Sequence, residues 1–186
     1  MLRRGGAQAI AAVLRKNHTL TNLNLCSNDL GEGGAQAIAA ALRENRTLTE
    51  LDLRNNDLGE GTGQAIAAAL GVNNTLTNLN LNYNALGEGG VQAIADVLRV
   101  NTTLTDLNLR YNDLGEGGGQ AIAAALVVNN TLTNLNLNDR LGEGVKSAVR
   151  QSWGNRGGTL ELDAVERRQR STAATSLGHG TRAERP

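Results

Sequence analysis

Leucine positions divide this chain into units of 28 residues. Five leucines mark the units, and each lies inside a Thr-Leu-Thr string: Leu20, Leu48, Leu76, Leu104 and Leu132. After each of them, leucines alternate with polar residues, as Leu23 and Leu25 do, which is typical of a short strand with one buried face. A later segment carries Ala37, Ile38 and Leu42 at helical spacing and predicts an amphipathic helix.

The repeats assign most of the chain to one array. We expect four complete units at 20–47, 48–75, 76–103 and 104–131. Residues 1–19 match the helix half of an earlier unit, and 132–156 form a degenerate last repeat or cap. Residues 157–186 are poor in large apolar side chains and are expected to be a disordered tail. Within that tail, TLELD (159–163) weakly repeats the strand pattern and is a candidate for one more strand.

One strand and one helix of this size cannot bury their own apolar faces, so the units must stack on one another. Stacking predicts an α/β solenoid curved like a horseshoe segment. Its parallel sheet lies on the concave face and its helices lie on the convex face.

Asparagine and glycine also recur with the 28-residue period. Position nine of each complete unit is an asparagine that can satisfy backbone groups of the turn: Asn28, Asn56, Asn84 and Asn112. A second column follows each helix, where a left-handed C-cap is expected: Asn17, Asn45, Asn73, Asn101 and Asn129. The repeated LGEG string resembles a phosphate-binding loop, but no Gly-Lys-Ser or Gly-Lys-Thr follows it, and each copy carries a glutamate. We interpret it as a turn that requires unusual backbone angles.

Composition excludes several classes of partner. Eighteen basic and eighteen acidic residues cancel, so no overall field attracts nucleic acid or a membrane surface. No apolar run approaches the roughly 20 residues that a transmembrane helix needs. Cys26 is the single cysteine and fits a reducing compartment, so a cytoplasmic location is expected. A nuclear location is the alternative, based on Arg167, Arg168 and Arg170.

No motif for catalysis or for a cofactor is found. The two histidines, His18 and His179, lie far from Cys26 along the chain, so a thiol nucleophile has no neighbouring base. No histidines or cysteines are paired at metal-ligand spacing. We therefore expect no enzyme activity, no cofactor and no metal.

The unit LTELDLRNNDLGEGTGQAIAAALGVNNT (48–75) resembles a leucine-rich repeat of the ribonuclease-inhibitor type. The same subtype occurs in NOD-like receptors and in Ran GTPase-activating proteins. The resemblance implies the solenoid described above and, for most members, binding of other proteins on the concave sheet and its rims. No motif here matches the functional residues of the GTPase-activating members.

Outward-facing strand positions and the residues beside them predict a protein-binding patch. Its members are Glu50, Asp52, Arg54, Asn80, Asn82, Tyr83, Asp106, Asn108, Arg110 and Tyr111. Tyrosine and arginine are enriched among the residues that dominate interface energies. Two alternatives stay open. One is a regulatory fragment of a protein that activates a small GTPase or resembles a NOD-like receptor; the other is a truncated repeat copy without activity. The uncapped N-terminal edge also predicts end-to-end self-association.

Overall fold

Six helices alternate with six short strands in the computed structural model, which describes residues 1–137 and 140–163. The helices are α1 Arg3–Leu14, α2 Gly31–Leu42, α3 Glu60–Leu70, α4 Gly87–Leu98, α5 Gly115–Val128 and α6 Glu143–Trp153. The strands are β1 Asn22–Asn24, β2 Glu50–Asp52, β3 Asn78–Asn80, β4 Asp106–Asn108, β5 Asn134–Asn136 and β6 Thr159–Glu161.

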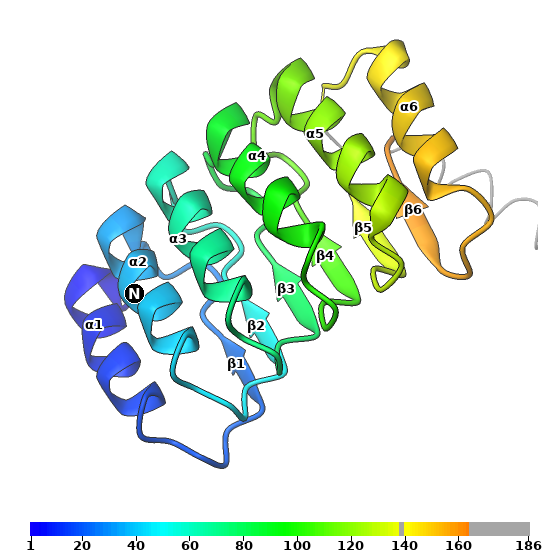
Figure 1. Ribbon diagram of the computed structural model, residues 1–186. Coiled ribbons are helices and arrows are strands. Elements are labelled where there is room, and N and C mark those ends of the chain that lie inside the picture. The colour runs from blue at the N-terminus through cyan, green and yellow to red at the C-terminus, as the bar shows by residue number, and fades with distance from the viewer. Residues whose placement is uncertain (138–139, 164–186) are drawn as a thin grey trace, which may run out of the picture.

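The strands form one parallel sheet in the order in which they occur along the chain. Leu23 pairs with Leu51, one repeat length away, whereas the last pair joins Leu135 to Leu160. Figure 1 shows the helices side by side in one layer and the strands in a second layer behind them. This arrangement confirms the α/β solenoid predicted from the repeat pattern.

The core between the two layers is almost entirely aliphatic. Leu48, Leu53 and Leu58 from one repeat are fully buried, as are Ile66 and Leu70 from the helix that follows. Each such side chain stabilises the fold by about 1.5–3 kcal/mol relative to an exposed one. The apolar periodicities read from the sequence therefore correspond to the faces that pack between sheet and helices.

Position-nine asparagines connect neighbouring repeats through their side-chain amides. Asn84 Oδ1 accepts hydrogen bonds from the backbone N–H of Asn56 (2.9 Å) and of Leu58 (3.3 Å). Its Nδ2 donates to the carbonyls of Leu53 (3.1 Å) and Leu81 (2.9 Å). Because backbone groups buried without a partner are costly, one side chain here stabilises two successive turns.

The second asparagine column works differently from the expected left-handed C-cap. Asn129 has φ −78° and ψ 122°, and no member of this column has a positive φ. Asn73 instead donates to the carbonyls of Leu42 (2.8 Å) and Asn45 (3.1 Å) in the preceding repeat. Its Oδ1 accepts from the N–H of Thr75 (3.0 Å) and Leu76 (2.9 Å). The C-cap prediction was wrong, because the amide is used to bridge repeats.

Unusual backbone angles occur in three of the five LGEG turns. Gly31, Gly87 and Gly115 have φ of 59°, 63° and 64°, in the region that favours glycine. The equivalent Gly59 and Gly142 have ordinary φ of −83° and −64°, so the expectation was wrong for these two turns.

The two ends of the described array differ. At the first end, β1 is an edge strand and Leu20 is 38% exposed, whereas the equivalent Leu48 is fully buried. Self-association through this edge stays a prediction. At the other end, β6 lies inside the segment that the sequence assigned to the disordered tail, so regular structure extends beyond residue 157. The rest of that tail, residues 164–186, lies outside the described residues.

An ion-pair cluster connects β6 to the last helix. Lys146 Nζ lies 2.7 Å from Asp163 Oδ1 and 2.9 Å from Glu143 Oε1. The hydrogen bond to Asp163, followed by that to Glu143, raises the pKa of Lys146 above its ordinary value. Trp153 is buried at the end of the same helix and closes the core.

We expect Asn84→Ala to lower the free energy of unfolding by about 1–3 kcal/mol, because buried backbone groups of two repeats lose their partner. Asn78→Ala is the matched control. Asn78 lies on a nearby strand position, and its side chain accepts a hydrogen bond from the hydroxyl of its neighbour Thr77. Urea denaturation of both variants measures the difference. Equal losses in the two variants would contradict the bridging role of Asn84.

Lys146→Met should also destabilise the fold, by about 1–3 kcal/mol, since it removes the shorter of the two ion pairs of Asp163 and leaves only the longer contact with Arg150. Because the folded state raises the pKa of Lys146, its contribution to the free energy of unfolding is fully present below the pKa of the unfolded state, about 10.5. It is lost as the pH rises through the higher folded value. Urea denaturation from pH 7 to 11 should therefore show a constant difference between variant and wild type up to about pH 10, followed by a decline. A difference that already falls between pH 7 and 9 would contradict this account.

Candidate functional site

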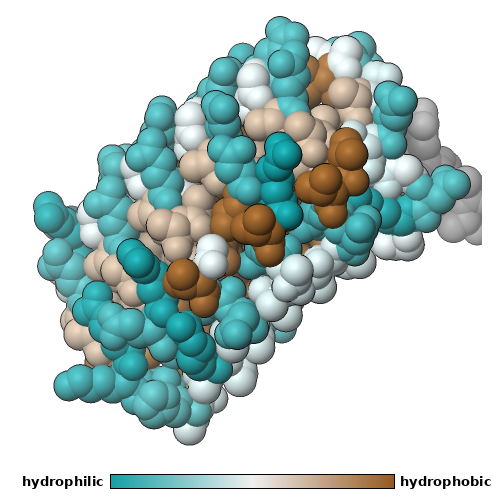
Figure 2. Space-filling model, viewed as in Figure 1, coloured by the Kyte–Doolittle hydropathy of each residue, from teal (hydrophilic) through white to brown (hydrophobic). Residues whose placement is uncertain are grey.

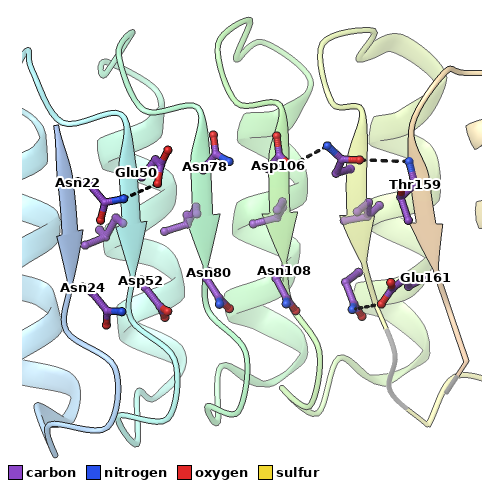
Figure 3. A pocket seen from close by; sticks show the side chains of 16 residues that line it. Asn22, Asn24, Glu50, Asp52, Asn78, Asn80, Asp106, Asn108, Thr159 and Glu161 are labelled. Atoms are coloured by element: carbon purple, nitrogen blue, oxygen red, sulfur yellow. Dashed lines mark hydrogen bonds between the residues drawn. The ribbon is translucent and has the colours of Figure 1, made fainter. Parts of the chain in front are cut away.

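Outward-facing side chains of the six strands form a hollow on the face of the sheet opposite the helices. Figure 3 shows these side chains in two rows across the strands. One row runs from Asn22 to Thr159 and the other from Asn24 to Glu161. Sixteen residues line the hollow, which has a volume of about 500 Å³, and we call it the concave groove.

Half of the predicted patch lies in this groove and half lies beside it. Five predicted residues line the groove: Glu50, Asp52, Asn80, Asp106 and Asn108. The other five follow the ends of their strands and form a second region, which we call the tyrosine rim: Arg54, Asn82, Tyr83, Arg110 and Tyr111. The structure thus divides the single predicted patch into two regions of different chemistry.

The groove is acidic, and side-chain amides or hydroxyls hold each of its carboxylates except Asp52, which contacts Arg54. Asp106 accepts from Asn134 Nδ2 (2.6 Å) and from the hydroxyl of Thr105 (2.7 Å). Glu50 accepts from Asn22 Nδ2. The sixteen lining residues include no lysine, arginine or histidine. These bonds orient the carboxylates without neutralising them.

Aromatic side chains of adjacent repeats stack in the rim. The ring centroids of Tyr83 and Tyr111 lie 4.5 Å apart with the planes tilted by 44°. The guanidinium of Arg110 lies 4.4 Å from the centre of the Tyr111 ring, and its Nη2 donates to Tyr111 Oη at 2.8 Å. Tyr83 is 52% exposed and Tyr111 is 37% exposed. A rigid aromatic and cationic surface therefore faces solvent beside the acidic groove.

The rim tyrosines have left-handed backbone angles, with φ of 53° at both positions. The equivalent residues of the two preceding repeats are Ser27 and Asn55, with φ of 57° and 55°. Small polar residues tolerate this region, whereas a bulky side chain in it is uncommon. The turn geometry is thus common to these repeats, and only the tyrosines carry a steric cost there.

Arg54 connects the groove to the rim. Its Nη2 lies 3.5 Å from Asp52 Oδ2, and its Nε donates to Cys26 Sγ at 3.2 Å. The hydrogen bond to Cys26 and the charge of Asp52 raise the pKa of Arg54. Arg54 is therefore the cation that contacts Asp52. Within residues 1–137 and 140–163, no three His, Cys, Asp or Glu side chains are placed to hold a metal.

Two surface features were missed by the analysis of the sequence. Glu161 on β6 adds a fourth carboxylate to the groove, and the TLELD string was the signal for it. Figure 2 shows apolar patches where α3, α4 and α5 end. Val72, Val100 and Val128 are half or more exposed at those ends and are spaced by the repeat length, which was the signal in the sequence.

The arrangement presents two surfaces suited to binding. The described residues offer an acidic groove and an aromatic rim, and Cys26 lies against Arg54 rather than a base. None of the helices in the described part of the chain has the length and apolar character needed to cross a bilayer.

Comparisons with known proteins give a family and a fold. The family described as "Leucine Rich repeat" matches residues 16–39, 44–67, 72–95 and 100–123. A structure of the leiomodin-1 actin-binding site 2 is similar, with a TM-score of 0.71 and 23% identity, over 91% of this chain and 95% of that chain. The tropomodulin C-terminal domain of Caenorhabditis elegans has a TM-score of 0.69 and 13% identity, over 93% and 99% of the two chains. No curated protein matches the sequence.

At these identities the structural matches establish the fold alone. The family match is stronger evidence, since it covers more than half of the chain in four segments spaced by the repeat length. The protein belongs to the leucine-rich repeat family.

Proposed function

We propose that this chain is a protein-interaction module that binds a protein partner with the concave groove and the tyrosine rim. The observation that carries the proposal is the pair Tyr83 and Tyr111. Both occupy a left-handed position that Ser27 and Asn55 occupy in other repeats, so tyrosine is not required by the turn. Strained residues cluster at binding surfaces, and tyrosine is a frequent interface anchor.

Polar atoms in the rim give further support. Asn82 Oδ1 and Arg110 Nε are buried without a hydrogen-bond partner among the described residues. Unpaired buried polar atoms are uncommon in native proteins, and each calls for an explanation. A partner that reorients these side chains, or brings water with it, would satisfy both atoms.

Actin is the first specific partner that we propose to test. One similar structure is the actin-binding site 2 of leiomodin-1, and this chain shares its fold. A small GTPase is the second partner to test; it rests on the resemblance to the ribonuclease-inhibitor subtype, which we keep as part of the proposal. We place the module in the cytoplasm, in keeping with its single cysteine.

The double variant Tyr83→Asn/Tyr111→Asn should separate binding from folding. Loss of the contact between the two rings lowers the stability by about 0.5–1.5 kcal/mol. Replacing tyrosine by asparagine at a left-handed position raises the stability by about as much. We therefore expect the free energy of unfolding to change by less than about 1 kcal/mol. Affinity for the partner should fall at least about tenfold. Urea denaturation and binding to purified actin are the measurements, with Tyr83→Phe/Tyr111→Phe as the control that keeps both rings.

A second variant tests the charged positions at the border of groove and rim. Asp52→Ala/Arg54→Ala/Arg110→Ala should lose partners that the wild type retains in a lysate pull-down. The matched control is Arg43→Ala/Glu44→Ala/Arg99→Ala, which makes the same change in charge at exposed positions near helix ends. Identical protein lists from both variants and the wild type would remove the concave groove from the proposal. A small GTPase among the lost partners would favour the second candidate over actin.

A further inference from the structure

The formal charge of the chain is zero only because two segments cancel. Residues 1–163 carry 13 basic and 16 acidic side chains, which gives a formal charge of −3. Residues 164–186 carry five arginines and two glutamates, which gives +3. Three of those arginines, Arg167, Arg168 and Arg170, lie close together near the start of the segment.

The concave groove is complementary to this segment. Glu50, Asp52, Asp106 and Glu161 line it, and none of the other described residues that line it is a lysine, arginine or histidine. Glu50 and Asp106 have no cation within 4.0 Å among the residues that the structure describes. Their hydrogen bonds come from uncharged groups of Asn22, Asn134 and Thr105. Arginine is well suited to such carboxylates because its guanidinium presents several donors in a plane.

The chain that follows Asp163 is long enough to bring these arginines to the groove carboxylates. Asp163 ends the described structure next to β6, and Arg167 and Arg170 follow it by four and seven residues. An extended chain covers about 3.3 Å per residue, so these arginines can lie up to about 13 and 23 Å from Asp163. Parallel strands are about 4.8 Å apart, which places β4 about 10 Å and β2 about 19 Å from β6. The reach thus includes Asp106 on β4 and both carboxylates of β2.

We infer that the segment containing Arg167, Arg168 and Arg170 docks across the concave groove of its own chain. The arginines pair with Asp106 and with Glu50 or Asp52, crossing the strands from β6 towards β2. The tether keeps the segment at an effective concentration of about a millimolar or more, so individually weak ion pairs are sufficient. These pairs are exposed at the groove surface and are therefore sensitive to salt.

Docking has a consequence for binding, and this consequence alone rests on the proposed function. A segment lying in the groove covers part of the surface offered to a protein partner. The partner must displace it, so the segment acts as a built-in competitor.

Zero-length cross-linking of the full-length chain tests the contact without any partner. Arg168→Lys keeps the charge and supplies an amine that a carbodiimide can join to a carboxylate in direct contact. We expect mass spectrometry to find residue 168 linked to Glu50, Asp52, Asp106 or Glu161, several-fold more often than to Glu32, Glu60, Glu88 or Glu116 at the helix N-termini. The ion pair of Lys146 with Asp163, at 2.7 Å, is the internal reference for cross-linking yield.

Two controls test the electrostatic origin of the contact. Links from residue 168 should fall several-fold in 1 M salt, where the screening length is about 3 Å. They should fall likewise when Arg167→Glu and Arg170→Glu are added to Arg168→Lys. Links spread evenly over all surface carboxylates, or links unaffected by both controls, would overturn the inference. A mixture of isotopically heavy and light chains must give links within one chain, and mixed links would overturn it as well.

A binding measurement separates this inference from the proposed function. Arg167→Glu/Arg168→Glu/Arg170→Glu should bind purified actin several-fold more tightly than the wild type does. Groove links without any partner binding would uphold the docked segment and count against the proposed function. Partner binding without groove links would uphold the proposed function and overturn the docked segment.

Discussion

The side-chain amide of a buried asparagine is the interaction on which this solenoid depends. Short parallel strands leave many backbone groups unpaired where the chain turns towards each helix, and water cannot reach them. Asn56 satisfies such groups in its own repeat and in the one before it, as donor to Leu25 and Leu53 and as acceptor from Asn28. Stacking is thereby fixed in register, because a slipped repeat would leave these groups without partners.

With stacking held by the core and the asparagines, the outward strand positions are free to vary. Asn22 and Glu50 occupy equivalent positions on neighbouring strands, as do Asn24 and Asp52. Neither the core nor the turns determine whether these positions carry an amide or an acid. Carboxylates gather on this face while the repeat pattern stays intact, which is why the groove could acquire its charge without a change in fold.

The sequence predicted the fold well because, in a repeat protein, the spacing of apolar residues indicates directly which side chains are buried. Leu51 and Leu79 had to face inward, and they do. The role of Asn73 could not be predicted in this way, because its hydrogen bonds reach a helix end 31 residues earlier, and that contact depends on how the repeats stack. For the same reason the candidate patch could be identified residue by residue, but not its division into groove and rim. That division depends on where each strand ends, between Asp52 and Arg54 for example.

Groove and rim differ in how they can contribute to recognition. Exposed carboxylates such as Glu50 act over a screened distance of about 8 Å at physiological salt, so they select for charge and speed up encounter. Tyr83 and Tyr111 act only in contact, and their stacking fixes the rings before a partner arrives. Binding at the rim therefore costs little side-chain entropy of Tyr83 and Tyr111, whereas the charges of the groove orient the partner. Arg54 belongs to the rim but contacts Asp52 of the groove, so a partner that binds Arg54 also changes the surroundings of a groove carboxylate.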